Sequence, residues 1–263
     1  MNRALKRRTT VVRAAWLLLA AVLVVSGVVA EGLYAQRRGG GFRGIYQDPN
    51  APYDGRFTFV RLSYQVYNGR SGWEFDYPAM ERNFMTIIND LSTLHPHVRE
   101  SNIHSMDDPI LSKYPIAYLS EPGYWIPDQP EVAGLRNWLK KGGFLIVDDF
   151  YGGAWANFER SMMAVLPTGK IVKLDVTNPI FNSFFKLKTL DGMYNPDDPN
   201  RTEGEYYGIY EDNDPSRRLM VVIDYNNDIG DFMEWSGTGY YQINFSNDAY
   251  KIATNYVIYA LTH

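Results

Sequence analysis

The segment Gly142–Ala154, GGFLIVDDFYGGA, determines the fold class and contains the first candidate functional residues. Its opening glycines predict the end of a helix, and the apolar run Phe144–Val147 predicts a buried strand. Asp148 and Asp149 follow this strand, and an aromatic pair and two further glycines then predict a turn. Carboxylates at such a strand end either cap the turn or contribute to a ligand site.

Strands and helices alternate on both sides of this segment. Apolar residues recur at intervals of three and four, which predicts helices, and short β-branched or apolar runs between them predict strands. The predicted helices run from Asp76 to Leu94, Asp128 to Leu139, Trp155 to Val165 and Ser246 to Leu261. The predicted strands are Arg56–Val66, Val98–Ile103, Tyr114–Ser120, Phe144–Val147, Ile171–Leu174, Tyr206–Tyr210 and Arg218–Tyr225. This order predicts an α/β fold, with a three-layer, mostly parallel sheet and helices on both faces.

Residues 1–35 predict a secretory leader or a membrane anchor. Five basic residues precede the uncharged apolar run Ala14–Ala30, and Leu33–Ala35 resembles a small-residue cleavage site. A run of 17 residues lies at the lower limit of what spans a bilayer, so cleavage and anchoring both stay open. Either outcome exports the domain, to the periplasm or to the outer face of the inner membrane. Residues 36–55 predict a flexible Gly, Pro and Arg linker, and residues 56–263 predict a single α/β domain.

Charge and cysteine content exclude several functional classes. The sequence has no cysteine, so disulfides, thiol catalysis and zinc–thiolate sites are excluded. Without the predicted leader, 21 of the 26 basic and 29 of the 30 acidic residues remain, a formal charge of −8. Such a charge repels phosphate backbones, and nucleic acid is therefore not expected as a partner.

Ligands of open parallel sheets bind at the carboxyl ends of the strands, where four loops of this chain are expected to meet. The four loops are Gln65–Asp76, Ser120–Asp128, Asp148–Gly153 and Asp224–Glu234. Between them they hold one basic residue, Arg70, and the acidic residues Glu74, Asp76, Glu121, Asp148, Asp149, Asp228, Asp231 and Glu234. Close carboxylates raise one another's pKa, so this group is expected to keep a proton, bind a divalent cation or be neutralised by Arg61. No organic cofactor is expected.

Turn and cap formation is the alternative explanation for each of these acids. Asp76 is placed to cap the helix that follows it. The alternate residues Asp224, Asn226 and Asp228 imitate the start of a calcium-binding loop, but the glycine and glutamate that an EF-hand needs further on are missing. A looser metal site formed by these three residues and a set of solvated turn acids both stay open.

Alternation along the strand distinguishes the two neighbouring aspartates. Asp148 shares the face of Phe144 and Ile146, so it is expected to be buried, with N–H groups of a neighbouring loop or Arg61 as partners. Asp149 points toward the loop and is the leading candidate for ligand contact. The candidate catalytic carboxylates are Asp149, Asp76 and Asp148, and the candidate ligand-binding residues are Asp149, Glu74, Trp73, Glu121, Asn226, Asp228 and Asp231.

Histidine and serine add no catalytic pattern. No histidine pair has the spacing of a zinc site, and no serine lies in a G-x-S-x-G turn. Aromatic residues gather in the same four loops, where they either suit a sugar ring or cover the core. The sequence therefore predicts neither a serine hydrolase nor a zinc enzyme.

Eight segments of the chain together resemble the bacterial domain of unknown function 4159. They are FTFVRLSY, WEFDYPAMERNF, DDPILSKYPIAYLS, LRNWLKKGGFLIVDDF, NPIF, YYGIY, MVVIDYNNDIGDFMEW and NYVIYALTH. The resemblance implies a flavodoxin-like, class I amidotransferase-like or trehalose-utilisation-like fold. Asp148 and Asp149 occupy the place of the amidotransferase cysteine, so that chemistry is not expected. The resemblance also implies association with MoxR-type ATPases and von Willebrand factor A-like proteins.

Two functions follow from these features. The first is a non-enzymatic binding or assembly module of the cell envelope, whose acidic and aromatic loops engage a protein or a glycan. The second is a carboxylate- or metal-dependent hydrolase of sugar or envelope substrates, in which two of Asp76, Asp148, Asp149 and Asp228 act as acid and base or as metal ligands.

Overall fold

The computed structural model describes residues 48–65 and 72–263. The predicted leader and most of the predicted linker lie outside the described residues. Among the described helices, none is both long and apolar enough to cross a membrane.

The compact unit begins at Asp48, ahead of the predicted boundary at Arg56. The reason is a pair of hydrogen bonds between the backbone of Ala51 and the side chain of Asn102: Ala51 N–H donates over 2.8 Å, and Asn102 Nδ2 donates to Ala51 O over 3.1 Å. Part of the predicted linker is therefore fixed to the edge of the domain.

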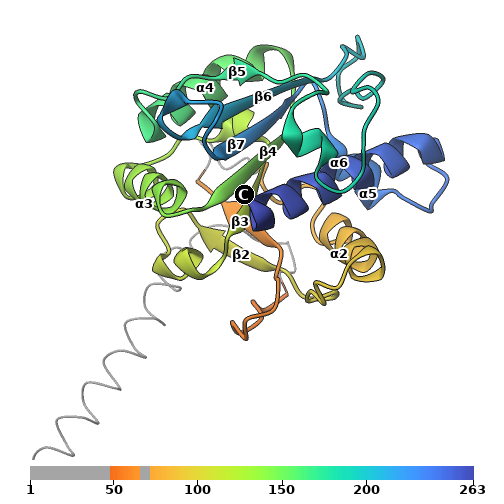
Figure 1. Cartoon of the computed structure of the whole chain (residues 1–263), viewed down its shortest axis with the longest axis horizontal. Coiled ribbons are helices and arrows are strands. Elements are labelled where there is room, and N and C mark those ends of the chain that lie inside the picture. The colour runs from red at the N-terminus through yellow and green to blue at the C-terminus, as the bar shows by residue number, and fades with distance from the viewer. Residues whose placement is uncertain (1–47, 66–71) are drawn as a thin grey trace, which may run out of the picture. The chain divides into compact units, whose positions relative to one another are not determined.

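Seven strands form one sheet in the order β2-β1-β3-β4-β7-β6-β5 (Figure 1). The strands are β1 (Val60–Ser63), β2 (Asn102–Ser105), β3 (Ile116–Ser120), β4 (Phe144–Phe150), β5 (Val172–Lys173), β6 (Glu205–Tyr210) and β7 (Leu219–Tyr225). The pairs from β2 through β7 are parallel, whereas β6 and β5 add antiparallel pairs at one edge. The predicted α/β fold with a mostly parallel sheet is confirmed.

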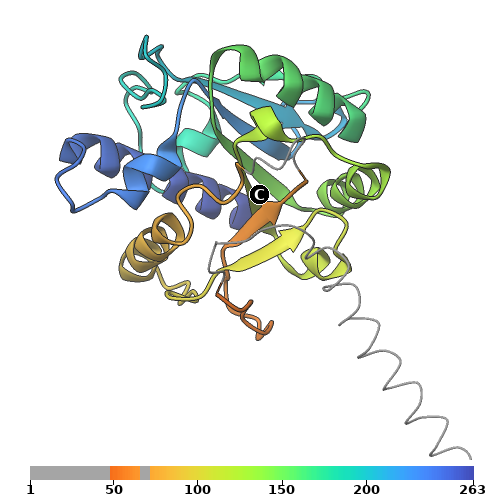
Figure 2. The ribbon, with the colours of Figure 1, turned by 180° about the vertical axis from the view of Figure 1, so that it is seen from behind.

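Helices cover both faces of this sheet (Figures 1 and 2). The helices are α2 (Ala79–Leu91), α3 (Gln129–Lys140), α4 (Trp155–Val165), α5 (Ile229–Glu234) and α6 (Ile243–Thr262). Residues of α3 and α4 form one buried cluster with one set of alternate strand residues, and residues of α2, α5 and α6 form a second cluster with the other set. Because successive side chains of a strand point to opposite faces of the sheet, alternate residues of each strand contribute to different clusters.

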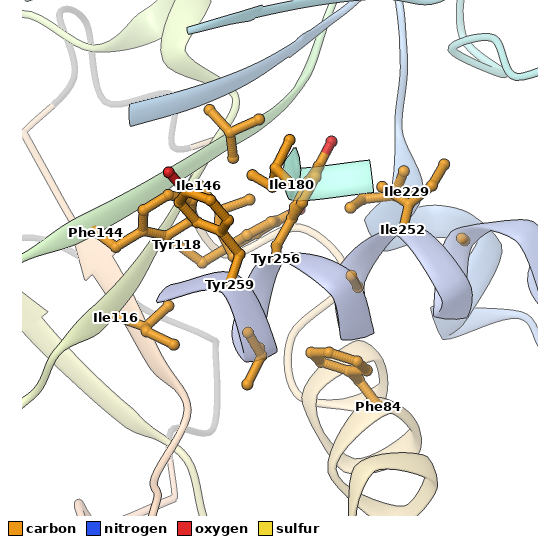
Figure 3. Packing of buried hydrophobic residues seen from close by; sticks show 14 of the residues in the cluster. Phe84, Ile116, Tyr118, Phe144, Ile146, Ile180, Ile229, Ile252, Tyr256 and Tyr259 are labelled. Carbon is orange, nitrogen blue, oxygen red and sulfur yellow. The ribbon is translucent and has the colours of Figure 1, made fainter. Parts of the chain in front are cut away.

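The core beneath α6 is rich in aromatic residues. Figure 3 shows Tyr256 and Tyr259 of α6 directed at the sheet, where Phe144 and Ile146 of β4 lie. The rings of Phe144 and Tyr259 are 6.0 Å apart between centroids. Burial of each such side chain contributes about 1.5–3 kcal/mol, so this face of β4 is firmly held beneath the candidate site.

The ends of several elements differ from the predictions. Asp128 caps α3 with a full capping box, as predicted. Asp76 does not cap α2: that helix begins after Pro78 without a side-chain cap, so the capping prediction is wrong. α6 starts at Ile243, ahead of Ser246, and β4 extends through both aspartates to Phe150. The short helix α5 was predicted as a turn, because six residues give too little periodicity to detect.

Candidate functional site

The carboxyl ends of β3, β4 and β7 and the loop between β1 and α2 bring polar residues to one edge of the sheet. Four of these residues adopt left-handed backbone geometry, with φ of +65° at Asp76, +50° at Glu121, +62° at Asp149 and +53° at Asn226. Such geometry is unfavourable for residues other than glycine, by about 1–3 kcal/mol in strained cases, and it concentrates at functional sites. Four of the eight described non-glycine residues with positive φ come from these loops, and this grouping of polar residues makes the edge the candidate site.

Five carboxylates form an acidic cluster, which we define as Asp76, Asp149, Asp228, Asp231 and Glu234. Oxygen atoms of Asp76, Asp149 and Asp228 all lie within 4.8 Å of one another. A second set within the same limit consists of Asp76, Asp231 and Glu234. Asp76 belongs to both sets and therefore joins them into one group.

Burial and mutual repulsion change the acidity of this cluster. Burial, and then the charge of Asp149, raise the pKa of Asp76 and of Asp228 well above the usual range. Burial and the neighbouring charges of Glu121 and Asp148 raise the pKa of Asp149 in the same way. A hydrogen bond from Asp228 to Asp149 opposes this shift, which requires one of the two carboxyl groups to hold a proton.

Asp148 lies beneath the cluster and is saturated with donors. Its Oδ2 accepts from the Tyr118 hydroxyl at 2.8 Å and from Gly230 N–H at 3.0 Å, and its Oδ1 accepts from Ile229 N–H at 3.2 Å. The predicted backbone donors are confirmed. Burial raises the pKa of Asp148 to about 6, while these three donors act in the opposite direction. Asp148 therefore fixes α5 to β4, and it has no free oxygen for catalysis.

Arg61 does not neutralise the cluster as predicted. Its guanidinium forms a buried ion pair with Glu81 and donates from Nη1 to the carbonyl groups of Trp73 and Phe75, at 2.8 Å each. The charge of Arg61 still lowers the pKa of Asp76, but less than burial and Asp149 raise it. Arg70, the basic residue predicted beside these loops, lies outside the described residues.

Asp149 is more enclosed than predicted. Its side chain is 7% exposed, and it accepts from Ser120 Oγ and from Asn195 Nδ2, each at 3.2 Å. Asp149 belongs to β4, and its left-handed backbone coincides with an irregularity in the pairing of β4 with β7 between Val147 and Phe150. Both donors are side chains at long distances, so Asp149 is held less tightly than Asp148.

The three residues that imitate a calcium loop have different surroundings. Asp224 is fully buried in the core and accepts from the Tyr256 hydroxyl at 2.6 Å. Asn226 accepts from Gly152 N–H at 3.1 Å. Asp228 alone joins the acidic cluster, where its Oδ1 also accepts from Asp231 N–H at 2.7 Å. Asp224 belongs to neither group of carboxylates that could hold a metal ion, so this geometry adds no support to a metal site on these three residues.

The remaining candidate ligand-binding residues lie either in the core or beside the acidic cluster. Trp73 is 6% exposed and packs in the core, so its ring is no ligand platform. Within residues 48–65 and 72–263, both carboxylate oxygens of Glu74 are buried without a hydrogen-bond partner. Glu121 flanks the cluster, and burial, followed by the charges of Asp197 and Asp76, raises its pKa to about 8. Glu121 therefore holds a proton near neutral pH.

Sequence reasoning missed two residues of the site. Asn195 reaches Asp149 from a loop 46 residues away in the chain, and no local pattern connects them. Gly230 lets α5 approach the cluster, since a Cβ there would lie 2.7 Å from the Tyr118 hydroxyl oxygen and 2.8 Å from Asp76 Oδ2. The glycine in DIGDF, directly after an acidic strand end, was the available signal.

The arrangement supports two kinds of chemistry. Three oxygens within 4.8 Å can surround one cation, because ligands of Ca²⁺ or Mg²⁺ lie about 2.0–2.6 Å from the ion and at most about 5 Å from one another. Carboxyl groups with raised pKa can instead store or transfer protons. The described acidic groups could thus hold a metal ion or act as an acid and a base.

Comparison with known proteins adds the family. No curated protein matches the chain. The model of the domain of unknown function DUF4159 matches residues 58–261, which include every element from β1 to α6 and the whole acidic cluster. The chain belongs to the DUF4159 family.

Proposed function

We propose that this chain is a binding module of the bacterial cell envelope, and that its acidic cluster takes up a divalent cation to complete the binding surface. The observation that carries this proposal is the convergence of Asp76, Asp149 and Asp228 within 4.8 Å. One oxygen of Asp76 is buried and has no hydrogen-bond donor among the described residues. A cation would supply the missing partner and would relieve the repulsion that raises these pKa values.

The geometry favours a module over an enzyme in one respect. Asp148 and Asp228 are turned toward backbone N–H groups, which fixes the loops rather than leaving the acids free to react. Asp76, Asp149 and Asp228 still have oxygens within 4.8 Å of one another, so these three carboxylates can face a ligand together. A cation held by them can recruit hydroxyl or carboxylate oxygens of a glycan or a protein from the envelope.

Export is part of this proposal. It is supported by the basic, apolar and small-residue order of residues 1–35. We expect protein from the native envelope to begin at Gln36 or Glu31 when its N-terminus is sequenced. Recovery of intact Met1 in the membrane fraction would establish an anchor, and recovery of the chain in the cytoplasm would contradict export.

Cation uptake is tested by thermal unfolding of the full-length chain in chelator and in millimolar calcium or magnesium. At hundredfold excess over Kd, binding adds about 2.7 kcal/mol, which corresponds to a rise in Tm of about 5–10 °C. Asp149→Asn and Asp228→Asn should abolish the rise. Asp90→Asn changes an exposed carboxylate of α2 and serves as the matched control, which should keep it. Unchanged Tm in the parent chain, with no metal found by elemental analysis, would refute cation uptake.

A hydrolase is the second candidate, and it has one observation in its favour. Glu121, with a pKa of about 8, and the strained Asp149 offer a proton donor and a base at the same edge. Hydrolysis would transfer a water proton to the base and give a proton to the leaving group. Release of soluble fragments from purified peptidoglycan by the parent chain, lost in Asp149→Asn, would favour the enzyme. Binding without release favours the module.

A further inference from the structure

We infer that a cavity at the turn after β4, whose first lining residue follows Asp149 of the acidic cluster by three positions, is a carbohydrate subsite that takes a neutral sugar ring. The cavity has a volume of about 470 Å³ and is lined by Gly152, Gly153, Trp155, Ala156, Tyr207 and Tyr225. Small-molecule sites typically measure about 300–1,000 Å³, so the cavity has the size of one. This inference rests on the proposed binding function and names its ligand class.

The cavity and the acidic cluster share one loop. Asp149 and Gly152 are three residues apart, and Gly152 N–H donates to Asn226, which lies two residues before Asp228. The Tyr225 hydroxyl donates to Gly152 O at 2.9 Å. The same short turn therefore carries a carboxylate toward the cluster and its glycines toward the cavity.

The aromatic rings of the cavity form an angled wall, in which the plane of Trp155 is inclined by 55° to that of Tyr207 and by 61° to that of Tyr225. The centroid of Trp155 lies 4.9 Å from that of Tyr207 and 4.8 Å from that of Tyr225. An aromatic box for a quaternary ammonium needs rings that face each other across the cation, each up to about 6 Å away. Rings already in contact leave no such space. They present a surface on which the C–H face of a sugar can stack.

The polar groups around this wall are suited to hydroxyl donors. The Tyr207 hydroxyl donates to the Glu205 carboxylate. Lys173 Nζ lies 2.8 Å from the same carboxylate and forms an ion pair with it. Burial and the charge of Glu205 raise the pKa of Tyr225, so its hydroxyl stays neutral and retains acceptor capacity. The Tyr225 hydroxyl and the Glu205 carboxylate can accept hydrogen bonds from sugar hydroxyls, and the Lys173–Glu205 pair adds no net charge beside the cavity.

Gly153 offers a clean test. A Cβ at this position would meet no atom within 4 Å, and its φ lies outside the left-handed range. Gly153→Leu therefore adds a bulky side chain at the lining of the cavity without a clash at its Cβ. Ala156→Leu adds the same side chain to the lining from α4, and Ala133→Leu places it at an exposed position of α3 as the matched control.

Binding is measured by isothermal titration calorimetry of the full-length chain with two neutral probes, the tetrasaccharide of N-acetylglucosamine and cellotetraose. We expect saturable binding of at least one probe, weakened about tenfold by Gly153→Leu and Ala156→Leu and unchanged in Ala133→Leu. Absence of binding of both probes, or equal affinity in the parent chain and both cavity variants, would overturn the inference. Binding of adenosine without either sugar would overturn it too.

Measurements of Tm and of sugar binding in calcium and in chelator distinguish the sugar subsite from the proposed cation uptake. A calcium-dependent rise in Tm without sugar binding leaves the cation proposal intact and refutes the sugar subsite. Sugar binding that persists in chelator, with no response of Tm to calcium, refutes cation uptake and supports the subsite. Sugar binding that requires calcium, together with the rise in Tm, supports both.

Discussion

Two polar regions of the molecule contain the adjacent residues Asp148 and Asp149, and these regions differ in how their charges are balanced. The inner polar group, which we define as Arg61, Glu81, Tyr118 and Asp148, pairs each charge with a partner of opposite charge or with several donors. The acidic cluster at the sheet edge brings five carboxylates together with few donors. The first region is built for stability, and the second tolerates repulsion that only a ligand or bound protons can relieve.

This difference is visible between adjacent residues. Asp148 is fully buried with three donors, whereas Asp149 has two side-chain donors at 3.2 Å, a hydrogen bond with the neighbouring carboxyl group of Asp228 and a left-handed backbone. Since a strained and poorly paired side chain persists only where the fold holds it in place, Asp149 is a better candidate for function than Asp148. Substitutions in the inner polar group should therefore lower stability, whereas substitutions in the acidic cluster should mainly affect ligand binding.

The largest effect is expected in the inner polar group. Arg61 is 0% exposed and Glu81 is 1% exposed, so Glu81→Ala leaves a buried guanidinium without its counter-charge. The loss of unfolding free energy should be about 3–5 kcal/mol, as measured by chemical denaturation. The double variant Arg61→Met/Glu81→Leu removes both charges and should lose less than Glu81→Ala. Equal stability of Glu81→Ala and the parent chain would show that the pair is not required.

A smaller loss is expected from Asp148→Asn. Both oxygens of Asp148 receive N–H or O–H donors, so an amide NH₂ would face a donor in either orientation. The unpaired donors should cost about 1–3 kcal/mol, measured in the same denaturation experiment. The contact between α5 and β4 should loosen first, which hydrogen exchange at Ile229 and Gly230 would detect. Unchanged exchange at these two amides would contradict the assigned role.

The sequence predicted the sheet because strand and helix periods are local signals. The run Phe144–Val147 is apolar throughout, which is the local pattern of a strand buried on both faces. Asp128, three residues before Glu131, is the local pattern of a capping box and marks the start of α3. The strand-end rule also predicted which loops carry the acidic cluster, since parallel strands end at one edge. These features need no knowledge of distant contacts.

The site itself depended on contacts that no local pattern encodes. Arg61 was expected to face the acids, but Glu81, on the first turn of α2, lies closer to it. Asp224 was expected at the rim, yet strand alternation places it in the core against Tyr256. The position of Asn195 depends on a long loop whose path the sequence does not specify. Side-chain partners therefore had to come from the structure.

The third prediction concerns pH and the flank of the acidic cluster. Glu121 has a pKa of about 8 in the folded chain and 4.5 as its ordinary value, so the folded state binds the proton more tightly. Stability in chelator should therefore fall as pH rises from about 4.5 to about 8 and then level off with respect to this group. Glu121→Gln should flatten that part of the profile, as measured by Tm across pH. Surface variant Asp90→Asn is the control and should retain the slope.

The smallest effect is expected for Asp149→Asn, the same substitution as at Asp148 but one residue further along. Asparagine tolerates the left-handed backbone at φ +62° better than alanine would, so the substitution adds little strain. Its amide can accept from Asn195 and donate to Ser120 Oγ, because a hydroxyl group can also accept. The lost negative charge relieves repulsion from Asp228 and Asp76, whose pKa values should move back toward their usual range. We expect the unfolding free energy in chelator to change by no more than about 0.5 kcal/mol, while the response to calcium disappears. If Asp149→Asn unfolds earlier than Asp148→Asn in chemical denaturation, the assignment of stability to one aspartate and ligand binding to the other is wrong.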